Sequence, residues 1–192
     1  MYTSEGGPGF SKQWNPVHVE IRKVNMRKLA VAAARPVRAS QSEVTEVVFP
    51  NDANPLGNML GGMVMHLMDM AAGIAAHRHS RSHVVTAAVD HMDFRCPIHI
   101  GDLIVLKASV NRVFRSSMEV GVKVFREEHI TNHREHTSSA YLTMVAIGAD
   151  GKPARAPQVL PETEEEQRRY LEAGMRRKWR VQQRGRKKRR QI

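Results

Sequence analysis

This chain of 192 residues has a single cysteine, Cys96, so it cannot form a disulfide within itself. A lone thiol is typical of proteins kept in a reducing compartment, so we expect a cytoplasmic location, with Cys96 as a small packing residue. Aromatic residues are few, at 5%. The first ten residues, MYTSEGGPGF, hold no apolar stretch of the kind that forms the core of a signal peptide.

Long apolar runs and common cofactor motifs are also missing. The longest apolar run, Leu60–Ala76, contains His66 and Asp69 and is shorter than the roughly 20 residues that cross a bilayer, so we expect no membrane span. The phosphate-binding patterns GxxxxGK[ST] and GxGxxG and the nucleophile pattern GxSxG are absent. The ten histidines are not spaced with acids or thiols as metal ligands are, so we expect no metal site.

The net charge of +11 is concentrated at the two ends of the chain. Residues 1–39 carry a net charge of +5 and residues 161–192 a net charge of +7, whereas residues 40–160 hold 11 basic and 12 acidic side chains. We therefore expect a basic leader (1–39), a nearly neutral central domain (40–157), and a charged helix with a basic tail (158–192). The final run RGRKKRR favours a solvated tail over a nucleic-acid contact, with attraction of an anionic partner as the alternative.

The hydrophobic pattern predicts one buried helix and several long strands. Strands are predicted at Ser42–Phe49, Val84–Phe94, Leu103–Phe114, Met118–Glu127 and Thr137–Ala149. A helix over Gly61–Arg78 is apolar on nearly every face, so it should be buried almost all round. Further helices are predicted at Ile21–Ala34 and Glu162–Gln183. This order predicts an α+β fold with one helix on a mostly antiparallel sheet, whose exposed edges favour dimerisation.

Asp69 stands out because burying an ionised carboxylate is costly unless the charge is paired or used. Gly61 and Gly62 begin the same helix, where free N–H groups can bind an oxyanion or where glycines simply permit close packing. Asp69 lies seven residues beyond Gly62, about 10 Å along the helix axis. A two-fold dimer with antiparallel helices would bring the acid of one chain to the helix start of the other. The alternative is a structural carboxylate paired with a residue such as His66.

Two motifs around this acid resemble a known family. The pattern N-x-x-G-N-x-x-G-G, followed by a helix with M-D-x-A-A/G-x-x-A, resembles the hotdog-fold acyl-CoA thioesterases of the cytosolic acyl-CoA hydrolase branch. The resemblance continues in VVTAAVDHMDFRCPIHIGD (84–102), RSSMEVGVKV (115–124) and PQVLPETEEEQRRY (157–170). It covers residues 42–175.

The resemblance implies a hotdog fold, in which a curved antiparallel sheet wraps around one long central helix. It implies hydrolysis of acyl-CoA to a free fatty acid and coenzyme A, a catalytic homodimer, a homohexamer, and no cofactor beyond the coenzyme A of the substrate. Asp69 matches the general base or nucleophile. Asn58, Gly61 and Gly62 of the partner subunit match the groups that polarise the thioester carbonyl.

Four further positions match the residues that contact coenzyme A in this family, namely Thr86, Arg115, Ser116 and Ser117. One position departs from the pattern, because Leu60 stands where many relatives have a histidine.

Two other functions are considered. One is a non-catalytic acyl-CoA sensor of the same fold that binds nucleic acid through its basic ends. The other is a hydratase or dehydratase of acyl thioesters, which in this fold uses a histidine with an acid, and here no histidine begins the helix.

Overall fold

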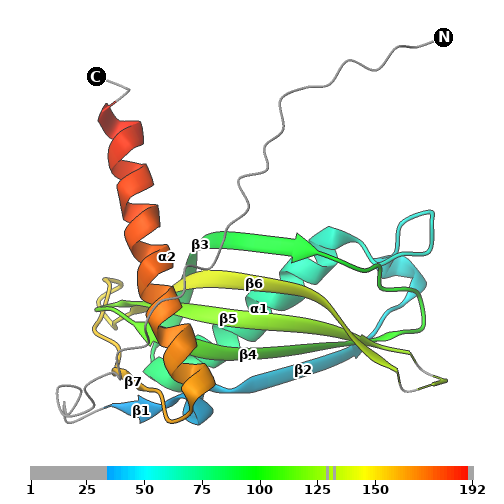
Figure 1. Cartoon of the computed structure of the whole chain (residues 1–192), viewed down its shortest axis with the longest axis horizontal. Helices are drawn as coiled ribbons and strands as arrows, with labels where there is room; N and C mark the ends of the chain where they lie inside the picture. The colour runs from blue at the N-terminus through cyan, green and yellow to red at the C-terminus, as the bar shows by residue number, and fades with distance from the viewer. Residues whose placement is uncertain (1–33, 129, 132, 190–192) are drawn as a thin grey trace.

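The computed structural model describes residues 34–128, 130–131 and 133–189 (Figure 1). Its elements are β1 (Arg35–Pro36), η2 (Val37–Ser40), β2 (Ser42–Val47), η3 (Pro50–Asp52), α1 (Gly61–Ser80), β3 (His83–Phe94), β4 (Leu103–Val113), β5 (Ser117–Glu127), β6 (Arg134–Ile147), β7 (Val159–Leu160) and α2 (Glu164–Arg189). The predicted helix at Ile21–Ala34 lies almost wholly outside the described residues. In the part that is described, neither helix is long and apolar enough to cross a bilayer.

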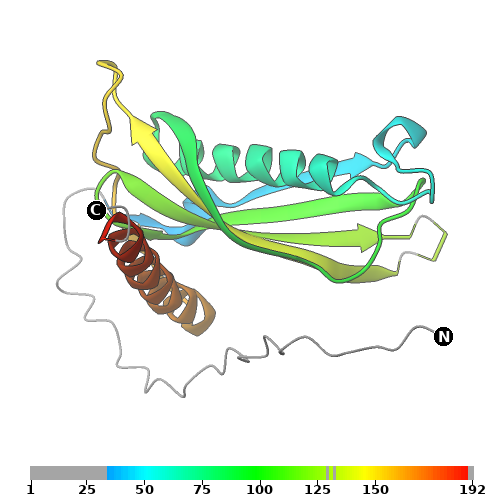
Figure 2. The ribbon, with the colours of Figure 1, turned by 90° about the horizontal axis from the view of Figure 1, so that it is seen from above.

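Five antiparallel strands form one sheet in the order β2-β4-β5-β6-β3. The sheet curves around α1, which lies along its concave face (Figure 2). Alternate side chains of the central strands, such as Leu106, Val120 and Leu142, point inward and are fully buried against Met68 and Ala72 of α1. The predicted α+β class and hotdog fold are confirmed.

One side of α1 is open in the single chain. Leu67 and Ala71 are buried, whereas Met65, Met70 and Ile74 are 48%, 40% and 38% exposed. The prediction that this helix is buried almost all round is therefore wrong for one protomer. The sheet covers only one side of the helix, and the apolar residues on its other side are exposed.

The edge strand β3 continues this apolar surface. β3 pairs with β6 on one side only, and Val85, Val89 and Phe94 are 50%, 52% and 53% exposed. A free strand edge beside an exposed apolar helix face is a surface that another protein chain can cover.

Helix α2 packs on the opposite, convex face of the sheet (Figure 2). Its anchor is Glu119, which is fully buried and accepts hydrogen bonds from Arg176 Nη2 at 2.7 Å and from Asn111 Nδ2 at 3.1 Å. The guanidinium of Arg176 also lies 3.7 Å from the centre of the Tyr141 ring. Charged and aromatic groups thus hold a helix that has few apolar residues.

Candidate active site

The loop before α1 is folded around Asn54. Its Oδ1 accepts hydrogen bonds from the N–H groups of Leu56 at 3.0 Å and Asn58 at 3.1 Å. The backbone N–H of Asn54 donates to the Asn58 carbonyl at 2.8 Å, and Asn58 forms an isolated β-bridge with His99. Because Oδ1 is engaged, the side chain of Asn54 has a fixed orientation. Its Nδ2 meets no acceptor in the described residues.

The start of α1 presents free N–H groups. Leu60 is the N-cap residue, and its side chain makes no capping hydrogen bond. The first N–H groups of the helix that donate hydrogen bonds to the Leu60 carbonyl are those of Met63 and Val64, at 2.9 and 3.2 Å. The N–H groups of Gly61 and Gly62 therefore have no acceptor within the described chain, and both glycines are exposed. Such donors can bind an oxyanion or a carbonyl oxygen.

Asp69 lies on the open side of α1 and is oriented by β3. Thr86 Oγ1 donates to Asp69 Oδ1 at 2.5 Å, which is a short charge-assisted hydrogen bond. His66, considered as a partner from the sequence, makes no hydrogen bond with this carboxylate. Oδ2 has no hydrogen-bond partner among the described residues, and Asp69 is exposed. Thr86, which was matched to a coenzyme A contact, thus lies against the acid.

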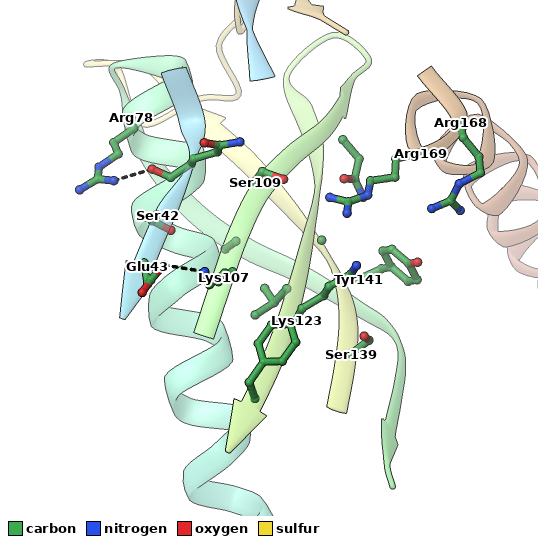
Figure 3. Close-up of a pocket in the computed structure, with 16 residues that line it drawn as sticks. Ser42, Glu43, Arg78, Lys107, Ser109, Lys123, Ser139, Tyr141, Arg168 and Arg169 are labelled. Atoms are coloured by element: carbon green, nitrogen blue, oxygen red, sulfur yellow. Dashed lines mark hydrogen bonds and ion pairs between the residues drawn. The ribbon is translucent and has the colours of Figure 1, made fainter. Parts of the chain in front are cut away.

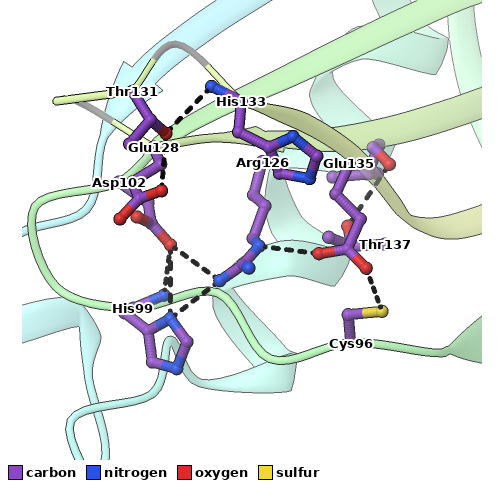
Figure 4. A network of polar contacts seen from close by, with 10 residues as sticks. Cys96, His99, Asp102, Arg126, Glu128, Thr131, His133, Glu135 and Thr137 are labelled. Atoms are coloured by element: carbon purple, nitrogen blue, oxygen red, sulfur yellow. Dashed lines mark hydrogen bonds and ion pairs between the residues drawn. The ribbon is translucent and has the colours of Figure 1, made fainter.

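The segment that follows β3 is braced by a polar network (Figure 4). Cys96 Sγ donates to Glu135 Oε1 at 3.1 Å, and Arg126 Nε donates to Glu135 Oε2 at 3.0 Å. Arg126 also lies 3.7 Å from Asp102 Oδ2 and 3.0 Å from His99 Nδ1. The hydrogen bond to the Glu135 carboxylate raises the pKa of the Cys96 thiol. Cys96, expected to be a packing residue, is half-buried and helps to fix the segment beside the start of α1.

A cleft of about 360 Å³ opens at this helix start. Its lining includes Met59, Gly61, Val64, Phe94 and Ile98. A Cβ on Gly61 would lie 3.5 Å from Phe94 Cζ, so the aromatic ring packs directly beside the helix start. The cleft can hold an apolar group next to the free N–H donors.

The hairpin Arg115–Ser117 lies at the far end of α1. Its turn is closed by a hydrogen bond from Phe114 N to Ser117 O at 2.9 Å, and Ala156 N donates to Arg115 O at 3.0 Å. The next residue, Pro157, accepts a hydrogen bond at 2.9 Å from His79 in the last turn of α1. Because α1 has 20 residues, about 30 Å separate its two ends. In one protomer the hairpin and the helix start do not share a site.

The predicted site residues therefore form three groups along α1: the helix start, Asp69 near its middle, and the hairpin at its end. The middle group supplies a free carboxylate oxygen, which can act as a base or nucleophile. The helix start supplies hydrogen-bond donors for a carbonyl oxygen. Across residues 34–189, apart from positions 129 and 132, no three His, Cys, Asp or Glu side chains gather as they do around a metal ion.

Comparisons with known proteins agree with this fold. The family model of the thioesterase superfamily matches residues 56–132. The uncharacterized acyl-CoA thioester hydrolase YkhA of Bacillus subtilis is 45% identical over 64% of this chain and 71% of its own length. The cytosolic acyl coenzyme A thioester hydrolase of Rattus norvegicus is 38% identical over 71% of this chain and 36% of its own length. The chain spans only 25% of mouse acyl-coenzyme A thioesterase 11.

Solved structures are similar over most of the chain. An apo-hexameric acyl-CoA thioesterase is 40% identical, with a TM-score of 0.76, over 79% of this chain and 97% of that one. The acyl-CoA hydrolase of Staphylococcus aureus, in complex with butyryl coenzyme A and coenzyme A, is 35% identical, with a TM-score of 0.76. It covers 81% of this chain and 95% of its own. The chain belongs to the hotdog-fold acyl-CoA thioesterases, in the branch of the cytosolic acyl-CoA hydrolases.

Proposed function

We propose that this protein hydrolyses acyl-CoA thioesters to a free fatty acid and coenzyme A, as an enzyme of lipid metabolism in the cytoplasm. One observation carries the proposal: Asp69, oriented by Thr86, keeps a free carboxylate oxygen, and the exposed start of the same helix has free N–H groups. The names of the relatives support the substrate class. The S. aureus hydrolase was solved with butyryl coenzyme A.

The catalytic unit is a homodimer in this proposal. The exposed apolar side of α1 and the free edge of β3 form the contact, and a two-fold axis sets the two α1 helices antiparallel. The Asp69 of one chain then faces the helix start of its partner, which closes the gap of about 10 Å between them. Because the two helices run antiparallel, the hairpin (115–117) at the end of α1 in the chain that supplies Asp69 lies toward the same end of the dimer as the partner's helix start. A homohexamer is supported by the hexameric thioesterases among the similar structures.

The chemistry needs a base or nucleophile and a polarised carbonyl. The thioester oxygen accepts hydrogen bonds from the N–H groups of Gly61 and Gly62, which stabilise the negative charge that develops on it. Asp69 Oδ2 takes a proton from the attacking water, or attacks the carbonyl carbon itself to give an anhydride that water then hydrolyses. The thiolate of coenzyme A leaves and is protonated. Water is the only co-substrate and nothing is oxidised or reduced, so the proposed reaction needs no redox cofactor, and the helix-start donors polarise the carbonyl without a metal ion in this proposal.

Asn54 is a better candidate than Asn58 for the amide that assists this step. Solved variants of the S. aureus hydrolase replace an asparagine, an aspartate 15 positions later, and a threonine 17 positions after that. Asn54, Asp69 and Thr86 have the same two separations. Asn54 also has a fixed side chain with a free Nδ2, which can donate to the thioester oxygen or to water. The sequence pattern contained both asparagines, and the first was overlooked.

The coenzyme A portion is assigned to Arg115, Ser116 and Ser117 of the chain that supplies Asp69. The arginine can pair with a phosphate group, and the hydroxyls can donate further hydrogen bonds. Thr86 is assigned to the orientation of Asp69 and not to the coenzyme.

Thiol release from acyl-CoA tests the function and the asparagine assignment together. We expect the wild-type protein to release coenzyme A, Asn54→Ala to lower kcat by about a hundredfold, and the matched Asn58→Ala to stay within a few-fold of wild type. Equal losses in both variants would contradict the assignment of Asn54. A folded wild-type protein that releases no thiol from any chain length would contradict the proposed function itself.

A further inference from the structure

A hollow of about 810 Å³ lies on the convex face of the sheet, on the side away from the open face of α1 (Figure 3). It extends from Gln41, whose carbonyl accepts a hydrogen bond from Arg78, and the start of the edge strand β2, across β4, β5 and β6 to the first turns of α2. This volume is in the range of sites for small molecules. None of the residues assigned to thioester hydrolysis lines it.

Part of the floor of the hollow is formed by small residues. Ser109 of β4 lies opposite Gly121 of β5, and Ser139 of β6 lies one row further along the same face. A Cβ on Gly121 would lie 2.8 Å from Asn111 Nδ2, so a larger residue at this position would collide with a buried side chain. The side chain of Asn111 thus covers Gly121, and the floor beside it offers the hydroxyl groups of Ser109 and Ser139.

Two lysines face each other across the floor. Lys107 and Lys123 are directly opposite in β4 and β5, and their side chains are 45% and 49% exposed. Like charges in this arrangement destabilise a sheet. Their carboxylate contacts lie on the outer sides: Glu43 is 3.1 Å from Lys107, and Glu165 is 3.8 Å from Lys123. An anion bound between the lysines would offset their repulsion.

The rim adds further positive charge. Five cationic side chains line the hollow, namely Arg78, Lys107, Lys123, Arg168 and Arg169, and Glu43 is the one carboxylate among the described lining residues. Arg168 contacts Glu165 and Glu172, and Arg169 contacts Glu165. Five cations thus face three carboxylates, which leaves an excess of two positive charges. A doubly charged anion matches that excess.

We propose that this hollow binds a phosphate ester, with its phosphate or diphosphate group between Lys107 and Lys123. Ammonium groups bind phosphate oxygens as point charges, and the hydroxyls of Ser109, Ser139 and Tyr141 can bind polar groups of the ester. The site lies on the other face of the sheet from Asp69, so it goes beyond the proposed hydrolysis. Two sources share this chemistry: a free phosphate ester, and the phosphates of coenzyme A.

Calorimetric titration with pyrophosphate tests the site. We expect the wild-type protein to bind pyrophosphate, and Lys107→Ala/Lys123→Ala to bind it at least tenfold more weakly. The matched control is Lys152→Ala/Lys178→Ala, which removes the same charge from two exposed lysines outside the hollow and should keep wild-type affinity. Circular dichroism checks that both variants are folded. Absence of pyrophosphate binding in the wild type, or an equal loss in both variants, would overturn the proposal.

A second titration with coenzyme A separates the two sources. If coenzyme A affinity falls in the Lys107→Ala/Lys123→Ala variant in parallel with pyrophosphate affinity, the ligand is the coenzyme of the substrate. If coenzyme A affinity is unchanged while pyrophosphate affinity is lost, the ligand is a separate phosphate ester. Both titrations measure binding and not turnover, so a failure of the proposed hydrolysis would leave this test intact.

Discussion

The two faces of the sheet hold their helices by different means. On the concave face, α1 is held by apolar side chains such as Met68 and Ala72, which are fully buried. On the convex face, α2 is held by the buried Glu119, its partner Arg176 and the stacking of arginine on tyrosine. Apolar packing has no preferred direction, whereas hydrogen bonds and ion pairs have strict geometry.

The two sides of α1 differ in the same way. The inner side of α1 supplies burial, and its outer side is left with exposed apolar residues and one carboxylate. Because packing does not orient that carboxylate, a single hydrogen bond from Thr86 does so. On the convex face, hydrogen bonds and ion pairs hold many polar side chains at fixed positions. Charged side chains on this face also line the hollow.

The largest expected effect concerns the open apolar surface of the concave side. We expect Val89→Glu on β3 to abolish self-association and to lower activity more than about a hundredfold, because it places a charge in a contact that excludes water. Val181→Glu on α2 is the control, since Val181 is 58% exposed and Val89 is 52% exposed. Light scattering after gel filtration measures the mass. A Val89→Glu protein of wild-type mass would place the dimer contact elsewhere.

The next largest effect concerns the anchor of α2. We expect Glu119→Gln to lower the free energy of unfolding by about 3 kcal/mol, because Arg176 would lose its buried carboxylate. Glu43→Gln, at an exposed ion pair with Lys107, should change it by less than about 1 kcal/mol. Denaturant unfolding followed by circular dichroism measures both. Similar values for the two variants would show that charge pairing does not hold the convex face.

A smaller effect is expected for the hydrogen bond that orients the acid. Thr86→Val keeps the shape of the side chain and removes the donor to Asp69. We expect kcat to fall about tenfold, with little change in Tm, because a hydrogen bond to a charged group contributes about 1.5 kcal/mol. Steady-state kinetics at saturating acyl-CoA measures kcat. A rise in KM at constant kcat would instead assign Thr86 to coenzyme A binding.

The smallest effect concerns pH. Burial lowers the pKa of His79 below its usual 6.5. Its Nε2–H donates to Pro157 O, and its Nδ1 is buried without a partner in the described structure, which suits the neutral ring. The unfolded chain therefore takes up a proton below about pH 6.5 that the folded chain does not. Stability should fall as the pH drops through that range, by at most about 1.4 kcal/mol per pH unit.

Comparison with His79→Gln isolates this contribution. Unfolding free energies of both proteins at pH 7.5 and pH 5.5 are needed, and the wild type should lose more stability between them than the variant. Equal losses would show that His79 does not contribute to the pH dependence.

Much of the fold follows from the pattern of apolar residues, and its failures have physical reasons. Strand β4 was predicted at Leu103–Phe114 and is observed at Leu103–Val113, because its run of β-branched and other apolar residues is typical of a strand. Strand β6 begins at Arg134, three residues before the predicted start. Arg134 and Glu135 are charged and extend the strand by pairing with Glu127 and Arg126 across the hairpin, which no apolar pattern indicates.

The candidate-site residues could be predicted only where a residue type differs from the apolar sequence around it. An acid in an apolar helix and a glycine pair at its start drew attention to Asp69, Gly61 and Gly62. Asn54 was overlooked in favour of Asn58, because both asparagines lie in one loop and the sequence does not show the hydrogen bonds that fix the side chain of Asn54. The open side of α1 was misjudged for a similar reason, since residues that pack in a core and residues that contact a partner chain are equally apolar.

Thiol release by Asp69→Ala is the most direct test of the central claim, measured over a series of acyl-CoA chain lengths beside the wild type. If Asp69 is the base or nucleophile, the variant should fold and assemble normally and lose at least about a thousandfold in kcat at every chain length. A variant that assembles and keeps wild-type turnover would contradict the account of this acid.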